Sequence, residues 1–381
     1  MIKIMLNSFY YVICFLILIT VIVFVHEFGH YLAAKKAGVK ILKFSIGMGP
    51  ELFGVTDKFG TRWSFSLLPI GGYVMMLGDE DISSSQSSET INQLSDEDKK
   101  KAFHLKSNWQ KMWISFCGPF ANYIYAFVVM IGVFIVAGVP VNTPEIDTVL
   151  PGSPAQMAGL MKGDVVKRIN DVEITRSDRV IGVVNSQKTD KLKVIVMRDG
   201  KELSFDVTPT SEEKRSLFGK KKGYKYIGVA FDSSRYEKVG VFKAIQHSFM
   251  SCVDTTIAMF KLFRKLFSGQ QSIDNLGGFV YMASITGDIA KSGNIIMLLM
   301  FTVTISLNLG FINLLPFPVV DGGNILVNFI EQCLGRPINR KIMDYIMSAG
   351  AICLIFLMLL TTLNDILRLK VVNDWFSALF N

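Results

Sequence analysis

Long apolar runs alternate with charged segments along the chain, and four of these runs are long enough to cross a lipid bilayer. They are Phe9–Val25, Ile114–Val139, Ile295–Val320 and Ile346–Leu363. A helix that spans a membrane needs about 20 predominantly apolar residues. The pattern therefore predicts a polytopic α-helical membrane protein with four transmembrane helices.

Residues 44–78, between the first two runs, have a different character. Glycines interrupt the β-rich stretch 62–74, and Pro69-Ile70-Gly71-Gly72 predicts a hairpin. The segment is too apolar for a free loop, and non-helical backbone at membrane depth must be covered by protein or line a wet cavity. We interpret it as a re-entrant β-hairpin beside the first span, with an ordinary cytoplasmic hairpin as the alternative.

Residues 141–210 show the pattern of a small soluble domain, with short strand-like runs separated by turn residues. Asn170-Asp171 and Asp199-Gly200 each lie between two apolar runs, which predicts two hairpins. A few strands and one short helix make a small β-rich domain inserted between the membrane parts. Such domains often take an extended peptide along a sheet edge.

Residues 241–267 carry apolar side chains at steps of three or four, the period of a helix. Charges interrupt this segment, so we expect an amphipathic helix at the membrane surface instead of a span. The polar residues 79–101 predict a mobile loop and the basic residues 211–225 a solvated linker. The predicted organisation comprises a first membrane part at 1–140, the β-rich domain at 141–210, a linker with the surface helix at 211–292 and a second membrane part at 293–381. The four spans are expected at about 9–30, 112–139, 293–315 and 345–367.

Composition and charge support this class. Of the 381 residues, 50% are apolar, and the net charge is +8. Lysine and arginine gather beside the span ends, which marks the cytoplasmic side and puts the ends of the first and third spans inside and the N-terminus outside. We attribute the positive charge to loops that face anionic lipid headgroups, and we expect no nucleic-acid binding. The five cysteines form no close pair, which predicts small core residues and no disulfides.

The candidate metal-ligating and catalytic residues lie in His26-Glu27-Phe28-Gly29-His30, which continues directly from the first apolar run. Two histidines four apart project from one face of a helix, which suits two imidazoles on one Zn²⁺ ion. The intervening Glu27 then lies beside the metal as a general base. An ordinary histidine at a helix end is the alternative, but ionisable groups at membrane depth favour a functional site.

A catalytic zinc site usually has three protein ligands. Asp321 directly follows the third run, between Pro316 and Pro318 on one side and Gly322-Gly323 on the other. The prolines end helical hydrogen bonding and the glycines allow a tight turn, so the carboxylate can point at the metal. The first and third spans end on the same side of the membrane if the segment between them crosses once. We therefore predict Asp321 as the third ligand, the alternative being the start of a cytoplasmic loop.

Several separated motifs in this order resemble the site-2 protease family of intramembrane zinc metalloproteases, and within it the bacterial RseP-like branch. The motifs are His26–His30, Phe44-Ser45-Ile46-Gly47-Met48-Gly49-Pro50, Pro69-Ile70-Gly71-Gly72-Tyr73-Val74, Gly118-Pro119 with Asn122, and Asn313 to Asp321-Gly322-Gly323. The inserted domain resembles a single PDZ domain, with Gly159-Leu160 and Gly163-Asp164 at matching positions.

The resemblance implies hydrolysis of peptide bonds in or near transmembrane segments of single-pass membrane proteins, such as anti-sigma factors or signal-peptide remnants. It implies a bacterial cytoplasmic membrane protein with its catalytic site toward the cytoplasm and its PDZ domain outside. Asn313 matches a position expected to hydrogen-bond the substrate backbone. Gly71, Gly72 and Tyr73 are expected to accept the unwound substrate as an added strand. Gly163 and Asp164 are expected to bind substrate at the PDZ domain, which could exclude bulky ectodomains or bind peptide termini.

Two other function classes remain open at this point. A PDZ domain on four spans could serve as a non-catalytic membrane scaffold, although such a protein has no need of Glu27. A membrane-anchored zincin of the soluble type would instead take a glutamate as third ligand from a soluble helix. Zinc content and cleavage of a transmembrane substrate discriminate among these classes.

Overall fold

The computed structural model describes residues 2–78, 95–187, 189–212, 215–216, 219–220, 224–231, 236–268 and 277–368. The chain forms two units. The first joins residues 1–133 to residues 245–381, and the second comprises residues 134–244. The inserted position of the second unit agrees with a soluble domain placed between two membrane parts.

Helices dominate the first unit. They are α1 (Ile2–Lys36), α3 (Asp96–Lys100), the 3-10 turn η1 (Phe103–Leu105), α4 (Asn108–Val136), α7 (Val241–Phe267), α8 (Phe279–Ser292), α9 (Ile295–Leu314), α10 (Asp321–Leu334) and α11 (Arg340–Arg368). Four of them, α1, α4, α9 and α11, are long and apolar enough to cross a membrane, which confirms the four predicted spans. The helix at 241–267 is also confirmed, and its place at the membrane surface stays a prediction.

The third span ends earlier than the apolar run suggested. Helix α9 stops at Leu314, and a turn leads to α10 at Asp321. Pro316 and Pro318 lack the N–H that a continuing helix needs, so the apolar residues up to Val320 belong to the turn. Of the loop predicted at 79–101, residues 79–94 lie outside the described residues, and Ser95 caps the short helix α3.

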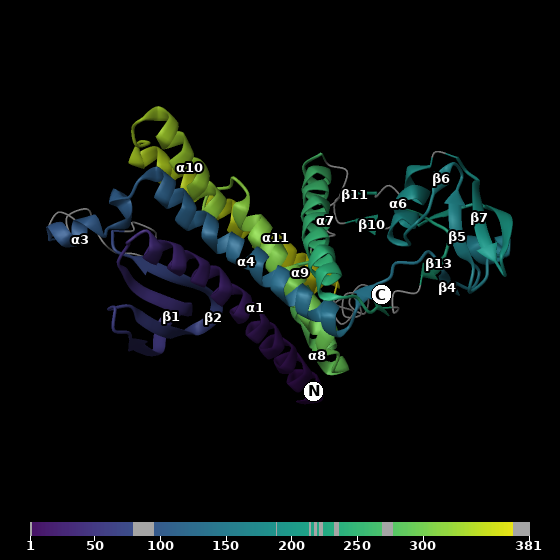
Figure 1. The fold of residues 1–381 in the computed structure, drawn as a ribbon, viewed down its shortest axis with the longest axis horizontal. Helices are drawn as coiled ribbons and strands as arrows, with labels where there is room; N and C mark the ends of the chain where they lie inside the picture. The colour runs from purple at the N-terminus through teal and green to yellow at the C-terminus, as the bar shows by residue number, and fades with distance from the viewer. Residues whose placement is uncertain are drawn as a thin grey trace, which may run out of the picture. The chain divides into compact units, whose positions relative to one another are not determined.

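Small residues allow α1, α4 and α9 to touch through their backbones (Figure 1). A Cβ on Gly29 of α1 would stand 2.3 Å from the Cys117 carbonyl oxygen of α4. Ser306 of α9 donates a hydrogen bond of 3.0 Å to the Asn122 carbonyl oxygen of α4. Close approach of this kind is how helices associate in lipid, where the hydrophobic effect adds little. It brings three spans together around the start of α4.

The β-rich segment forms one sheet from two long strands, β1 (Ile41–Thr56) and β2 (Arg62–Met76). Residues 41–46 lie opposite both 72–76 and 62–65, while 51–56 lie opposite 62–66. Each strand therefore bends and contributes twice to the sheet, and the positive φ of Gly47 (87°) and Gly49 (86°) permits the bend in β1. One face, centred on the buried ring of Phe44, packs against α1.

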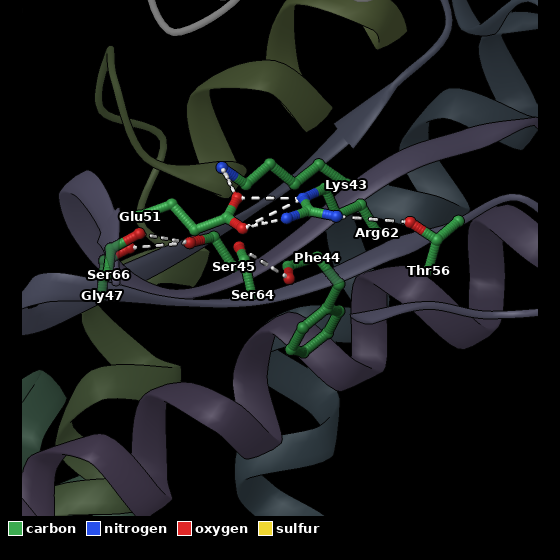
Figure 2. A network of polar contacts seen from close by, with 9 residues as sticks. All are labelled: Lys43, Phe44, Ser45, Gly47, Glu51, Thr56, Arg62, Ser64 and Ser66. Atoms are coloured by element: carbon green, nitrogen blue, oxygen red, sulfur yellow. Dashed lines mark hydrogen bonds and ion pairs between the residues drawn. The ribbon is translucent and has the colours of Figure 1, made fainter. Parts of the chain in front are cut away.

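The other face of the sheet is polar. Glu51 accepts hydrogen bonds from Arg62 at 2.5 and 3.0 Å, and its carboxylate lies 3.1 Å from the Lys43 ammonium. Figure 2 shows this network on one face of the sheet and Phe44 on the other. Charged groups are costly in contact with lipid tails. We infer that this face meets water or protein and not lipid tails. A re-entrant sheet would have to be oriented accordingly, and its insertion into the membrane stays a prediction.

The second unit is a small β-rich domain. Its elements are β3 (Val139–Pro140), β4 (Ile146–Val149), α5 (Pro154–Ala158), β5 (Val165–Ile169), β6 (Val172–Glu173), α6 (Asp178–Ser186), β7 (Leu192–Arg198), β8 (Lys201–Val207), β9 (Thr210–Glu212), β10 (Arg215–Ser216), β11 (Gly219–Lys220), β12 (Tyr224–Tyr226), β13 (Val229–Phe231) and β14 (Tyr236–Glu237). One sheet has the strand order β6-β5-β7-β8, and β4 pairs with β13.

This domain extends past residue 210, where the sequence prediction ended it. Ile227 is buried in the core with Ile146 and Val166, and the pairing of β13 with β4 closes the domain. The two hairpins predicted at Asn170-Asp171 and Asp199-Gly200 are present between β5 and β6 and between β7 and β8. Asn170 and Asp199 both have φ of 49°, as tight hairpin turns require.

Asp164 corrects one expectation, because its carboxylate is fully buried and therefore not presented to a peptide. Arg198 donates to it from Nε at 2.6 Å and from Nη2 at 2.8 Å, and the backbone N–H of Met161 donates at 2.9 Å. Gly163 forms the adjoining turn with φ of 90°. Asp164 thus fastens this turn to β7.

An Asp164→Ala variant should destabilise the second unit by about 1–3 kcal/mol, because it removes the buried acceptor of the hydrogen bonds from Arg198 and from the Met161 N–H. Hydrogen exchange of the full chain, followed along residues 145–207, measures this loss against an Asp171→Ala control at an exposed position. Equal protection in both variants would show that the ion pair does not hold the domain.

Candidate metal centre

The two histidines of the motif point into the packed interior from α1. His26 and His30 are 7% and 9% exposed, and their Nε2 atoms lie 3.2 Å apart. Helical spacing of four places both rings on one face. Gly118 of α4 makes room for them, because a Cβ at that position would stand 2.1 Å from His30 Nε2.

Asp321 reaches the same point from the far end of the sequence. Its Oδ2 lies 3.1 Å from His26 Nε2, and its Oδ1 lies 3.4 Å from His30 Nε2. It is the first residue of α10, where a carboxylate is favoured by the helix dipole. The turn before it folds back so tightly that a Cβ on Gly322 would stand 2.1 Å from the Leu315 carbonyl oxygen. The sequence thus brings together the three residues predicted as ligands.

The two imidazole nitrogens and the Asp321 carboxylate lie about as close together as the ligands of a tetrahedral zinc site. Bond lengths of about 2.0–2.1 Å imply about 3.3–3.4 Å between neighbouring ligand atoms on a tetrahedron. In the triangle formed by the two Nε2 atoms and the Asp321 carboxylate, the separations are 3.2 Å between the nitrogens, 3.1 Å from His26 to Oδ2 and 3.4 Å from His30 to Oδ1, each close to that value. Two imidazoles and a carboxylate form a donor set typical of catalytic zinc, with a fourth position left for water or substrate. These residues therefore fit Zn²⁺.

Outer hydrogen bonds orient both imidazoles. His30 Nδ1–H donates to the Ile114 carbonyl oxygen at 2.8 Å, which leaves Nε2 with its lone pair free for a metal. The Asn122 amide lies 3.3 Å from His26 Nδ1, and among the described residues its buried Oδ1 finds no hydrogen-bond donor. Turning that amide by 180° lets Oδ1 accept from His26 Nδ1–H and satisfies both groups. His26 Nε2 is then free in the same way.

The sequence did not reveal this role of Asn122, which entered the prediction only through its motif with Gly118-Pro119. The available signal was a polar residue inside an apolar span, close to Gly118-Pro119. Nothing local shows that its partner is a histidine 96 positions earlier in the chain. The Ile114 carbonyl oxygen gave no signal at all, because backbone groups are the same at every residue.

Glu27 and Asn313 lie beside these ligands. A Cβ on Gly72 would stand 3.0 Å from Glu27 Cγ, so β2 passes directly over this side chain. Asn313 of α9 places its Nδ2 3.4 Å from His26 Nε2. Asn313 therefore offers an N–H donor next to the ligand triangle.

Burial shapes the electrostatics of the centre. Burial acts to raise the pKa of the Asp321 carboxyl, but the imidazoles of His30 and His26 outweigh it and hold that pKa below its ordinary value. Asp321 is thus a carboxylate, the form that binds metal. The exposed fractions of the three ligand side chains are 9%, 11% and 16%, which restricts access to water.

The other residues predicted to bind substrate fall into two groups. Gly71, Gly72 and Tyr73 lie in β2, and Gly72 contacts Glu27 as described. Gly163 and Asp164 belong to the second unit, where they build a turn. The five cysteines, which were predicted as small core residues, are free; Cys252 is buried, Cys14 and Cys117 are half-buried, and Cys333 and Cys353 are exposed.

Comparisons with known proteins agree with this chemistry. A family model described as peptidase family M50 matches residues 14–357. A Campylobacter jejuni protein named as a zinc metalloprotease is 35% identical over 360 residues, covering 93% of this chain and 92% of that protein. A Rhizobium meliloti protein with a zinc-metalloprotease name is 32% identical, covering 94% and 97%. The regulator of sigma-W protease RasP of Bacillus subtilis is 31% identical, covering 94% and 98%.

Proposed function

The chain belongs to peptidase family M50, the site-2 protease family of zinc metalloproteases, and from that premise we propose that it hydrolyses peptide bonds in or near the transmembrane segments of single-pass membrane proteins. His26, His30 and Asp321 hold Zn²⁺ in this proposal. The observation that carries it is the convergence of the two Nε2 atoms, 3.2 Å apart, with the Asp321 carboxylate, whose Oδ2 lies 3.1 Å from His26 and whose Oδ1 lies 3.4 Å from His30.

Zn²⁺ bound there supplies Lewis-acid activation of a water molecule and of the scissile carbonyl. Glu27 accepts the proton of the attacking water as general base and then donates it to the leaving amine as general acid. The contact of Glu27 Cγ with the backbone of β2 at Gly72 supports this role, since it limits the positions the carboxylate can take. A larger residue at position 72 would push the carboxylate away.

Asn313 serves as a hydrogen-bond donor to the substrate backbone in this proposal. Its Nδ2 lies 3.4 Å from His26 Nε2, at the edge of the ligand triangle. A donor there could reach the carbonyl oxygen of a substrate bound beside His26, His30 and Asp321. Such a donor stabilises the negative charge that develops on that oxygen in the transition state.

A helical substrate hides its carbonyl groups, so it must unwind before cleavage. Residues 71–74 of β2 pair with β1 on one side, and within the described residues the sheet contains no other strand. We propose that Gly71, Gly72 and Tyr73 receive the unwound segment as an added strand. The strand would then pass over Glu27, because Gly72 contacts that side chain.

The substrate class follows from the membrane setting and from the relatives. The name of RasP calls it a regulator of sigma-W. We propose anti-sigma factors or signal-peptide remnants as substrates for this chain. We also propose that the metal centre lies toward the cytoplasm and that the second unit is a PDZ domain on the outer side, where it binds peptide termini. The lysines at the end of α1 support this orientation.

Proteolysis of a model single-pass substrate by the purified, reconstituted chain tests the proposal. Cleavage should stop when a chelator removes zinc and return when zinc is added back in slight excess. Failure to cleave any transmembrane substrate with zinc bound would favour a scaffold that binds peptides without cutting them. Cleavage that persists after complete zinc removal would exclude the metal mechanism.

A further inference from the structure

A hollow of about 300 Å³ lies at the lysine-rich end of α1, among residues that the metal centre does not use. Lys35, Lys40 and Lys101 line it together with Tyr31, Phe59 and Thr61. These residues come from α1, from the segment that leads into β1, from the turn between β1 and β2, and from the segment after α3. Residues far apart in the sequence thus bring three lysines to one cavity.

The charge of this cavity is only partly neutralised. The Lys40 ammonium pairs with Asp98 at 3.0 Å. Asp98 also interacts with Lys101 and Asp57 with Lys35, so three lysines face two aspartates. The Asp57 carboxylate accepts hydrogen bonds from Trp63 Nε1 at 3.1 Å and from the backbone of Phe59 at 2.8 Å. Within the described part of the chain, no carboxylate forms an ion pair with Lys35 or Lys101. The cavity therefore keeps an excess of positive charge.

Aromatic rings make the rest of the wall. The Lys35 ammonium lies 4.1 Å from the centroid of the Phe59 ring and donates a hydrogen bond of 3.2 Å to the Tyr31 hydroxyl. These contacts position the Lys35 ammonium, and the bond to Tyr31 uses one of its three N–H donors, which leaves N–H groups for another acceptor. Phe59 is 63% exposed, so an apolar surface continues outward from the cations. Cations beside an apolar surface suit a ligand with an anionic head and an apolar tail.

The cavity stands at the boundary of the bilayer. The span of α1 ends at Lys36, one residue after Lys35. Trp109 and Trp113, at the start of α4, are 64% and 50% exposed and share a second hollow with Lys36. Exposed tryptophans beside lysines at the end of a span mark the headgroup level. A ligand at this level meets the membrane lipids at high local concentration.

We propose that this cavity binds the phosphate headgroup of an anionic membrane lipid, with Lys35 and Lys101 holding the phosphate. Basic pockets at the ends of spans recognise lipid headgroups in this way. The exposed ring of Phe59 and the lipid-facing side of α1 then accept the first part of the acyl chains. The apolar wall and the membrane boundary favour a lipid over free phosphate or a soluble anion.

Native mass spectrometry of the full chain with added phosphatidylglycerol or phosphatidylcholine tests the proposal. Phosphatidylglycerol should be retained in preference to phosphatidylcholine. A Lys35→Gln/Lys101→Gln variant should bind phosphatidylglycerol about thirtyfold more weakly, since each lysine near an anionic headgroup contributes about fivefold. A Lys58→Gln/Lys100→Gln variant removes the same charge from exposed positions outside the cavity lining and should bind as the parent does.

Three outcomes would overturn the proposal. One is equal retention of the two lipids, and another is an equal loss in both double variants, which would indicate a diffuse basic surface. The third is displacement of the lipid by millimolar inorganic phosphate, which would indicate a site for free phosphate. If the Lys35→Gln/Lys101→Gln variant does not fold, a Lys35→Arg/Lys101→Arg variant keeps the charge and should retain phosphatidylglycerol, while loss of binding there would contradict the proposal.

Discussion

A Glu27→Gln variant is expected to bind zinc as fully as the parent and to lose peptide cleavage by a factor of about 10²–10⁴, the range that a positioned general acid–base group contributes. Glutamine keeps the size of the side chain and therefore its contact with Gly72. It cannot accept a proton from the attacking water. Zinc should stay, because the three converging ligand atoms belong to His26, His30 and Asp321.

Two measurements on the same preparation decide this prediction: zinc per chain by elemental analysis, and the cleavage rate of the reconstituted protein. Glu97→Gln, at an exposed position in α3, removes the same charge without touching the centre and should leave both values unchanged. Full cleavage by the Glu27→Gln variant would contradict the role of Glu27. Loss of zinc together with cleavage would instead make Glu27 part of the metal site.

The convergence of His26, His30 and Asp321 could be predicted from sequence because each step used a local signal. Spacing of four on a helix pairs His26 with His30, and the prolines and glycines around Asp321 mark a helix end that turns sharply. Counting spans placed these two regions on the same side of the membrane. The structure brings Asp321 to within 3.1 and 3.4 Å of the two imidazoles.

What could not be predicted depends on contacts between distant residues. Asn122 is a polar residue whose meaning depends on a ring that α1 presents to it. The sheet of β1 and β2 was predicted only as a hairpin, because the second contribution of each strand requires pairing across the bends at Gly47 and Gly49. The end of the β-rich domain was placed too early for the same reason. The strand at 229–231 is short, and only its pairing with β4 shows that it belongs to the domain.

An Asp321→Asn variant is expected to weaken zinc binding by more than about 100-fold, since loss of an outer-shell partner alone costs about 10–100-fold and here a ligand is lost. Asparagine keeps the volume, so the turn at Gly322 can stay as it is, but its amide is a poor ligand for zinc. The test is zinc retention against a competing chelator, with the cleavage rate measured at saturating zinc. Asp344→Asn is the matched control, because Asp344 is exposed on α11 and its substitution removes the same charge. Parent-like zinc retention in the Asp321→Asn variant would show that the carboxylate near His26 and His30 is not a ligand, and the proposed mechanism would fail with it.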